Sequence, residues 1–430
     1  MSRKFTTPLA VALMLGTGLS GFAQDGNRPA TPNADVLNGL DVITVVGAQT
    51  STDDVAGSVT FLGPDTLTLQ SYSDINRVLR AVPGVNIQEE DGYGLRPNIG
   101  IRGSGADRSS KVVIMEDGVL MSPAAYAAPA AYYFPTTGRM NAVEVSKGPA
   151  TLKYGPNTTA GALQLLSTPI PTEVSAHLDL TVSDLGTTRV HGWAGKTFDA
   201  GAFDAGILLE TYQNSGDGFK AIDNGGDTGY DIEDYVLKLG ATSKDGRQSL
   251  QFKFQTSDEV SNETYLGLTQ ADFDTESTRR YNASADDQFV SDHQTYQLTH
   301  NLDLAADFTL AYRTEFARNW RKLDGFNNSE LSDSGECNSL DEILRDPTTC
   351  DTEFAVLEGA AGYISPDDAL QIRSNNRTYY TKGIQTALGG TVETGGVTHN
   401  LGASIRYHED GVDRFQDQDG YRMDNGSLVL

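Results

Sequence analysis

The chain has 430 residues, of which 38% are hydrophobic, and a formal net charge of −26 from 32 basic and 58 acidic side chains. This acidic excess excludes a nucleic-acid partner, because binding to a phosphate backbone needs a basic face. The charge itself says little about the fold. The modest hydrophobic content is compatible with strands in which apolar and polar side chains alternate.

Residues 1–23 have the pattern of a secretory signal peptide. Arg3 and Lys4 precede an apolar stretch at residues 9–19, and small residues stand where a signal peptidase cleaves. The apolar stretch is too short to span a bilayer as a helix. No later segment has the ~18 consecutive apolar residues of a membrane-spanning helix. A membrane location therefore requires a closed barrel, the other architecture that pairs all its backbone polar groups.

A polar linker follows over residues 24–50, with Pro29 and Pro32 in its first part, and its composition is typical of a segment disordered in isolation. Within it lies a short β-prone run that consists of Asp41, Val42, Ile43, Thr44, Val45, Val46 and Gly47. The pattern predicts an extended segment, which can join the edge of another sheet through main-chain hydrogen bonds.

The most informative stretch runs from Leu79 to Pro169 and repeatedly joins a short apolar strand to a Gly or Pro turn. Its phrases read LRAVPGVNI, NIGIRGSG, VVIMEDGVLMSP and VEVSKGPATLKYGPNTTAGALQLLSTP. Glycine takes positive φ at tight corners without steric cost, and Asp117-Gly118 predicts one such turn. We therefore expect a small, densely wound α+β domain.

Together these phrases closely resemble the plug domain of TonB-dependent outer-membrane receptors. The resemblance implies a plug at residues 51–172 and an antiparallel transmembrane β-barrel over residues 173–430. It also implies TonB-energised nutrient uptake in the outer membrane of a Gram-negative bacterium, with periplasmic TonB and outer-membrane lipid as partners. The run at 41–47 is then the TonB box. Only about seventeen residues separate it from the signal peptide, too few for the signalling domain of some ferric-citrate receptors.

From residue 173 onward, segments with period-two alternation predict antiparallel strands. These segments are 177–183, 206–212, 235–241, 249–255, 296–302, 308–316, 384–392 and 401–407. Short connections at 199–201, 244–247, 305–307 and 394–396 alternate with long ones at 214–230, 258–292 and 321–376. Transmembrane barrels have this asymmetry, with short periplasmic turns and long extracellular loops.

The pattern amounts to about nine or ten strands, whereas receptors of this family have barrels of ~22 strands around a plugged lumen. Residues 421–423 and 427–430 are predicted to begin another strand, and the aromatic C-terminal residue usual for outer-membrane barrels is missing. We therefore expect a C-terminally truncated receptor whose partial barrel has two open edges. A non-functional truncated product is one possible reading of such a chain.

The two cysteines, Cys337 and Cys350, lie in a polar stretch typical of a surface loop. In the oxidising compartment that a signal peptide implies, we expect them to form a disulfide. A metal site would need neighbouring His or further Cys residues, and none is near.

The plug phrases and the segment ETYLGLTQADF at 263–273 look most like the ferric-dicitrate receptor branch, which imports iron(III) as a citrate chelate. This resemblance implies an anionic substrate held by Arg and other donors. It implies no cofactor and no direct metal ligand, because the chelator fills the coordination sphere. The alternatives are uptake of haem, cobalamin or an oligosaccharide. An enzyme is not expected, since the plug contains no His and no clustered carboxylates.

Four residues become candidates for substrate binding through that resemblance. Arg102 retains the Arg of the IRG phrase, and Lys147 stands where the branch has Arg. Tyr126 lies in an apical loop, close to the place where the branch has a substrate-binding Gln. Tyr93 lies near the place where the branch has an apical Thr. Because donors are missing, the Ala- and Tyr-rich loop 126–134 would better suit a chelate with an aromatic or apolar surface. The structural alternatives are that Arg102 pairs with a barrel carboxylate and that Lys147 stabilises the plug.

Overall fold

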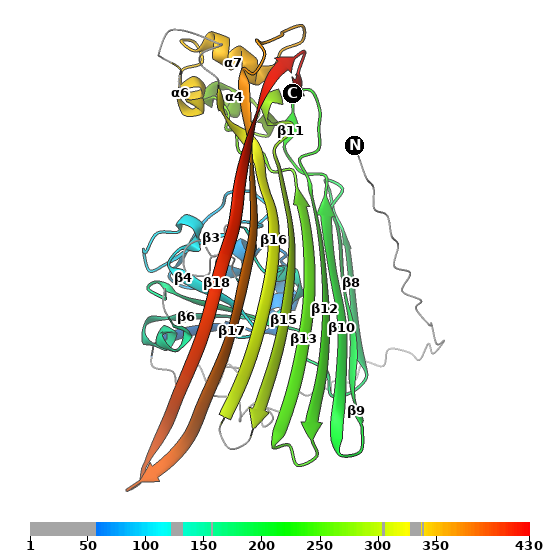
Figure 1. Ribbon diagram of the computed structural model, residues 1–430, viewed down its shortest axis with the longest axis vertical. Coiled ribbons are helices and arrows are strands. Elements are labelled where there is room, and N and C mark those ends of the chain that lie inside the picture. Colours follow the sequence, from blue (N-terminus) through cyan, green and yellow to red (C-terminus); the bar gives the residue numbers. More distant parts are fainter. Residues whose placement is uncertain (1–56, 122–131, 156–157, 303–305, 327–336, 338) are drawn as a thin grey trace, which may run out of the picture.

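The computed structural model describes residues 57–121, 132–155, 158–302, 306–326, 337 and 339–430 (Figure 1). The predicted signal peptide (1–23), linker (24–50) and TonB box (41–47) lie outside these residues, as does Tyr126. Within the described ranges, no helix is long and apolar enough to cross a membrane.

A five-stranded mixed sheet forms the centre of the plug, in the order β1-β6-β7-β4-β5. Its strands are β1 (Ser58–Leu62), β4 (Val112–Glu116), β5 (Val119–Leu120), β6 (Met140–Lys147) and β7 (Gly161–Ser167). β4 runs parallel to β7, and the other neighbours are antiparallel. Every residue of β4 is buried, because this strand is covered on both faces.

Two short helices and a hairpin complete the plug: α2 (Pro64–Gln70), α3 (Ile75–Leu79), and β2 (Val85–Gln88) paired with β3 (Asn98–Ile101). α3 begins where the Asp74 side chain accepts a hydrogen bond of 2.7 Å from the Asn76 backbone N–H. Its apolar side chains join those of β3, β4, β6 and β7 in one core. The remaining turns are short 3-10 helices, η2 (Asp107–Ser109), η3 (Thr137–Arg139) and η4 (Gly148–Tyr154).

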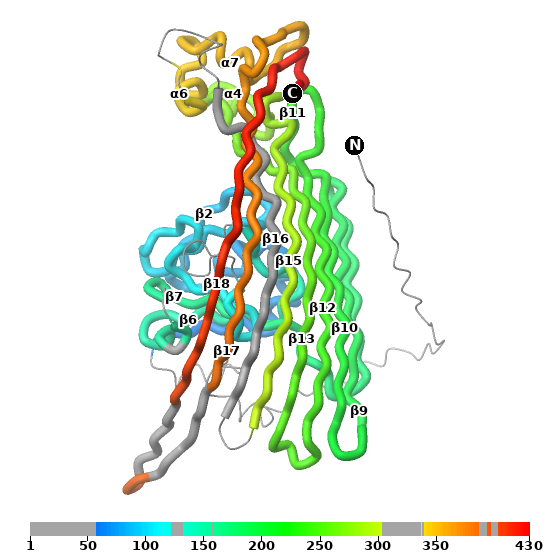
Figure 2. Tube along the Cα trace, viewed as in Figure 1, coloured from blue at the N-terminus to red at the C-terminus, as the bar shows by residue number. Residues whose placement is uncertain are grey.

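A curved sheet of ten antiparallel strands forms the second part of the chain, and we refer to it as the barrel wall (Figure 1). In chain order its strands are β8 (Ser175–Val182), β9 (Thr188–Asp199), β10 (Phe203–Gly216), β12 (Tyr230–Ser243), β13 (Gln248–Ser261), β15 (Gln288–Leu302), β16 (Ala306–Phe326), β17 (Leu370–Thr394), β18 (Val397–Asp424) and β19 (Ser427–Val429). Each strand pairs with the next, so the wall is an up-and-down meander. The plug lies against the wall, which curves around it (Figure 2).

Seven of the eight predicted strand segments lie within strands of the wall, and the eighth, 177–183, ends one residue beyond β8; β9 has no counterpart among them. Its alternation is interrupted by Gly192 and Gly195. A Cβ at Gly195 would lie 2.7 Å from Pro171 in the connection between plug and wall. The glycine therefore allows a close approach of that connection, and the strand loses its apolar signal there.

The long connections are shorter than predicted, since the strands continue several residues further at that end. They span 217–229, 262–287 and 327–369, instead of beginning at 214, 258 and 321. The predicted new strand at the C-terminus is also different. Residues 421–423 are the end of β18, and β19 folds back on them as a hairpin.

The long connections fold together at one end of the wall, and we call residues 217–229, 262–287 and 339–369 the loop cap. It contains β11 (Ala221–Ile222), α4 (Gln270–Thr275), β14 (Arg279–Arg280), η5 (Asn282–Ser284), α6 (Leu340–Arg345) and α7 (Asp351–Glu358). The cap has its own apolar core, which includes Tyr281, Ile343, Val356, Leu357 and Met423. A disulfide joins Cys337 to Cys350 with the Cα atoms 5.7 Å apart.

Candidate functional site

The apical loop of the plug, residues 89–97, connects β2 to β3 and reaches the loop cap. Asp91 fixes its shape, because its carboxylate accepts hydrogen bonds of 2.5–3.2 Å from the backbone N–H groups of residues 93–96. Gly92 has φ 89°, and a Cβ there would lie 2.8 Å from the ring of Phe219 in the cap. The loop is therefore pressed against the cap at a position where only glycine fits.

Tyr93 joins the apical loop to the loop cap. Its hydroxyl donates to the carbonyl of Thr228 at 3.2 Å and accepts from the backbone N–H of Phe219 at 3.1 Å. Its ring centroid lies 5.3 Å from that of Phe219 and 4.7 Å from that of Tyr230. Tyr93 is half-buried, and it lines a small cavity between plug and wall together with Tyr133, Tyr212 and Glu259, among others.

Arg96 anchors the other end of the apical loop. Its guanidinium makes a two-pronged contact with Glu259, at 3.1 and 2.6 Å, and lies 3.8 Å from the ring centroid of Phe289. A second carboxylate, that of Glu263, lies 3.8 Å from it. Burial raises the pKa of Glu263 to about 7, although the charge of Arg96 opposes this rise.

Arg102 and Lys147 lie on another part of the plug. The backbone N–H of Arg102 donates to the Gly84 carbonyl at 2.8 Å, and its exposed side chain lies beside Gly148. Lys147 is 3% exposed, and its Nζ donates to the Pro83 carbonyl at 2.9 Å. The structure thus places Lys147 inside the plug, which favours its structural alternative. It brings neither residue together with Tyr93.

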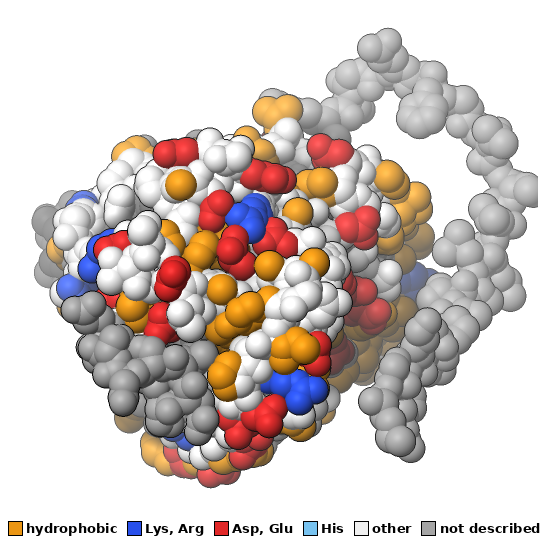
Figure 3. Space-filling model, turned by 90° about the horizontal axis from the view of Figure 1, so that it is seen from above, with side chains coloured by type: hydrophobic (Ala, Val, Ile, Leu, Met, Phe, Trp, Pro, Cys, Tyr) orange, Lys and Arg blue, Asp and Glu red, His pale blue; other side chains and the backbone are white. Residues whose placement is uncertain are grey.

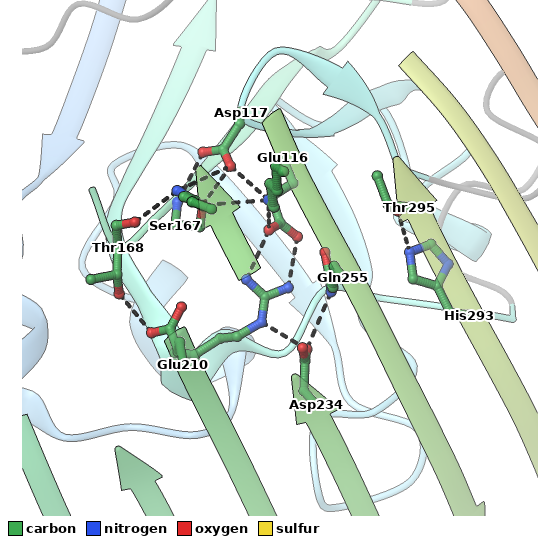
Figure 4. Close-up of polar contacts among 12 residues, drawn as sticks. Glu116, Asp117, Ser167, Thr168, Glu210, Asp234, Gln255, His293 and Thr295 are labelled. Atoms are coloured by element: carbon green, nitrogen blue, oxygen red, sulfur yellow. Dashed lines mark hydrogen bonds and ion pairs between the residues drawn. The ribbon is translucent and has the colours of Figure 1, made fainter. Parts of the chain in front are cut away.

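A buried network of charges joins the plug to the wall. On the plug side, Arg139 makes a two-pronged contact with Glu116, at 2.8 and 2.9 Å, and its Nε donates to Asp234 of β12 at 2.7 Å. Lys253 of β13 binds Glu116 and also lies 2.6 Å from Asp117. Figure 4 shows Glu116 and Asp117 facing these side chains of the wall.

Lys238 of β12 completes the network from the wall. Its Nζ donates to the Ser167 hydroxyl at 2.6 Å and to the Thr168 carbonyl at 2.7 Å, and it lies 3.8 Å from Asp117. Burial alone would raise the pKa of Glu116, but the charges of Arg139 and Lys253 outweigh it and hold that pKa below its ordinary value.

Sequence reasoning did not find this network. Asp117 and Gly118 form the predicted turn, with φ 47° and 81°, yet the Asp117 carboxylate also binds Lys253. The available signal was the presence of charged residues, such as Lys238 and Lys253, inside segments with strand alternation. No pattern in one segment identifies a partner more than 90 residues away.

In the described part of the chain, no three His, Cys, Asp or Glu side chains are placed to hold a metal ion.

Residues 51–162 match the family model described as the TonB-dependent Receptor Plug Domain. This part of the chain is therefore a plug domain of the TonB-dependent receptor type. The matched residues include β1, β4, β5 and β6 of the plug sheet and the first two residues of β7. No comparison tests the predicted boundary between residues 172 and 173, which lies between β7 and β8.

Two curated relatives cover the receptor in part. It is 25% identical over 221 residues to an iron-regulated outer membrane virulence protein of Vibrio cholerae, covering 49% of this chain and 32% of that protein. It is 25% identical over 174 residues to the vitamin B12 transporter BtuB of Vibrio vulnificus, covering 39% of this chain and 28% of that protein. The receptor thus spans about a third of the length of these relatives. The first of them is named as an outer membrane protein.

Solved structures share the fold. The ferric citrate transporter FecA in its unliganded form matches with a TM-score of 0.63 and 17% identity, over 89% of this chain and 51% of that one. The pyoverdine outer membrane receptor FpvA from Pseudomonas aeruginosa matches with a TM-score of 0.59 and 12% identity, over 87% of this chain and 51% of that one. These matches confirm the predicted fold class, a plug followed by antiparallel barrel strands. The names of these two proteins are those of a transporter and a receptor.

Proposed function

We propose that the receptor takes up an iron(III) chelate, such as ferric citrate or a siderophore, in a process energised by TonB. The observation that carries the proposal is the apical loop of the plug, docked beneath the loop cap in a fold similar to that of FecA. The iron-regulated relative from Vibrio cholerae supports iron as the cargo. The iron travels as part of the substrate, so the receptor needs no cofactor.

In this function the two ends of the plug have different tasks. The chelate enters from the side of the loop cap and meets the apical loop at Tyr93. TonB acts from the periplasm on residues 41–47, which remain a predicted TonB box. If residues 41–47 add a strand to a sheet of TonB, TonB binds them through main-chain hydrogen bonds and needs no preformed pocket.

A second candidate substrate is cobalamin, because a relative at 25% identity is a vitamin B12 transporter. The two candidate substrates are distinguished by measuring the uptake of 55Fe-labelled chelates and of labelled cyanocobalamin in cells that express the receptor. Iron uptake above that of cells without the receptor supports the proposal. Uptake of cyanocobalamin alone selects the second candidate, and uptake of neither contradicts the proposal.

The role of TonB is tested with Ile43→Pro, which removes a main-chain donor and fixes φ in the predicted TonB box. We expect chelate binding to cells to be unchanged and energised uptake to be lost, because affinity resides in plug and wall. Ile43→Val, which keeps the backbone donor, is the matched control and should transport normally. Normal uptake by Ile43→Pro would show that residues 41–47 are not the TonB box.

A further inference from the structure

Two adjacent arginines of the loop cap face opposite environments. β11 and β14 form a parallel pair in which Ala221 lies opposite Arg279, and side chains alternate between the two faces of such a ribbon. Arg279 meets three carboxylates, with contacts of 2.8 Å to Asp223, 2.7 Å to Asp272 and 3.1 Å to Glu358. Its charge is therefore fully compensated inside the cap.

Arg280, on the other face, has only neutral acceptors. Its Nε donates to the Thr264 hydroxyl at 3.1 Å, and its Nη1 donates to the carbonyls of Ser277 and Arg279 at 3.1 and 2.5 Å. Across the described residues its Nη2 has no hydrogen-bond partner, and it is not one of the fully buried atoms. The guanidinium is thus held in place with one donor edge available.

Lys220 converges on the same place. Its Nζ lies 3.4 Å from the carbonyl of Thr264, the residue whose hydroxyl binds Arg280. Burial lowers the pKa of Lys220, and the charge of Arg280 lowers it further. Burial also lowers the pKa of Arg280. Two cations are therefore held near each other in a partly desolvated position, which is unfavourable without an anion.

No carboxylate in the described part of the chain lies within ion-pair distance of Lys220 or Arg280. The acidic groups that act on Lys220 from further away are Asp91, Glu263 and Asp287. Each has other partners: Asp91 accepts from four backbone N–H groups, Glu263 accepts from Ser261 and Tyr265, and Asp287 accepts from the Tyr265 N–H.

The pair lies next to the apex of the plug. The residue before Lys220 is Phe219, whose backbone N–H donates to the Tyr93 hydroxyl, and Tyr93 also acts electrostatically on Arg280. Viewed from the end that carries the loop cap, basic side chains occupy a few separate places among more widespread acidic ones (Figure 3).

We infer that Lys220 and Arg280, with Tyr93 beside them, form a binding site for free carboxylate groups of the incoming chelate. The inference rests on the proposed function and narrows it to chelates that carry such groups. Arg280 offers the planar donor edge that carboxylates bind, Lys220 adds a second positive charge, and Tyr93 borders the site from the plug. The carboxylate of the ligand supplies the negative charge that no described side chain provides within ion-pair distance of Lys220 and Arg280.

The test measures binding of 55Fe-labelled ferric citrate to the receptor in its outer membrane, normalised to receptor amount. Lys220→Gln and Arg280→Gln each remove one charge and should weaken binding on the order of tenfold or more. Lys220→Arg keeps the charge and should bind nearly as the parent does. Arg345→Gln removes an exposed charge of the cap that pairs with Asp341 and should leave binding unchanged.

Parent-like binding of ferric citrate by both Gln variants would overturn the inference and leave the proposed function intact. If the parent receptor binds ferrioxamine B, a chelate without carboxylates, but not ferric citrate, the proposed function again stands and the inference falls. If it binds neither chelate, both fail. If a Gln variant does not reach the membrane, the test is the binding of ferric citrate to the parent receptor at increasing salt concentration. A carboxylate bound by these cations loses affinity as the salt concentration rises. Binding that does not depend on salt overturns the inference.

Discussion

At the scale of single residues, Glu263 is a carboxylate that the fold buries beneath the loop cap. It accepts hydrogen bonds from Ser261 at 2.9 Å and Tyr265 at 3.0 Å, and Arg96 approaches only to 3.8 Å because its two-pronged contact is with Glu259. The nearby charges of Asp91 and Glu259 add to the effect of burial. The native receptor therefore favours the protonated form of Glu263 more than the unfolded chain does.

This difference in the pKa of Glu263 between the folded and unfolded chain predicts that the stability depends on pH. The pKa of Glu263 is about 7 in the folded state against an ordinary value of 4.5, so the folded state binds the proton more tightly. Its contribution is fully present below about pH 4.5 and is lost as the pH rises to about 7, by roughly 3 kcal/mol at most. Glu263→Gln, which cannot ionise, should lose less thermal stability between pH 5 and pH 8 than the parent. Parallel pH profiles of the two thermal midpoints in detergent would contradict this.

The apical loop shows how far single residues could be predicted. Tyr93 was expected on an apical loop through the resemblance to the ferric-dicitrate branch, and the hydrogen bonds of Asp91 that shape this loop are local. Its partners Phe219 and Thr228 lie more than 120 residues away, and no local pattern links them. The same holds for Lys220 and Arg280, since only the pairing of β11 with β14 brings their loops together.

At the scale of elements, the loop cap is a folded unit rather than a set of separate loops. The disulfide between Cys337 and Cys350 lies in its apolar core, with both cysteines buried. Arg279 ties three parts of the cap together through Asp223, Asp272 and Glu358. These links hold the segments that carry Lys220 and Arg280 in one arrangement before any ligand is present.

Removing the disulfide should loosen the cap. The bond closes a loop over a sequence separation of 13 residues, and for a loop of about this length a stabilisation of roughly 3 kcal/mol is expected. The double variant Cys337→Ser/Cys350→Ser should therefore be cleaved faster by protease within residues 339–369. The reduced parent is the matched control and should be cleaved at the rate of the double variant. Equal rates for the oxidised parent and the variant would show that the apolar core alone holds the cap.

Strands were predicted where apolar and polar side chains alternate along the sequence, as they do on the two faces of a strand. β8, β10, β12 and β13 have apolar residues on one face and polar ones on the other, so their alternation is visible. β9 was missed because glycines replace side chains where the connection from the plug crosses it. The ends of strands were placed too early because β13 continues through Asp258 and Glu259, whose polarity is typical of a loop.

At the scale of the whole molecule, plug and wall are joined by a balanced set of buried charges. Glu116, Asp117 and Asp234 provide three negative groups, and Arg139, Lys238 and Lys253 provide three positive ones. Both domains contribute both signs, so neither domain is balanced without the other. Such networks are weak evidence for stability as a whole, but removing one member leaves an unpaired buried charge.

Arg139→Met should therefore destabilise the docked plug, because it leaves Glu116 and Asp234 without the guanidinium that bridges them. We expect a loss of about 3–5 kcal/mol, measured as a lower thermal midpoint in detergent. Lys244→Met is the matched control: Lys244 is 40% exposed on a short turn of the wall, where it pairs with Asp199 and Asp204, and such exposed pairs contribute little to stability. The double variant Arg139→Met/Glu116→Gln should lose less than the sum of its single variants, since the two residues share one contact. Strict additivity, or a loss no larger than that of Lys244→Met, would mean that this network does not join the plug to the wall.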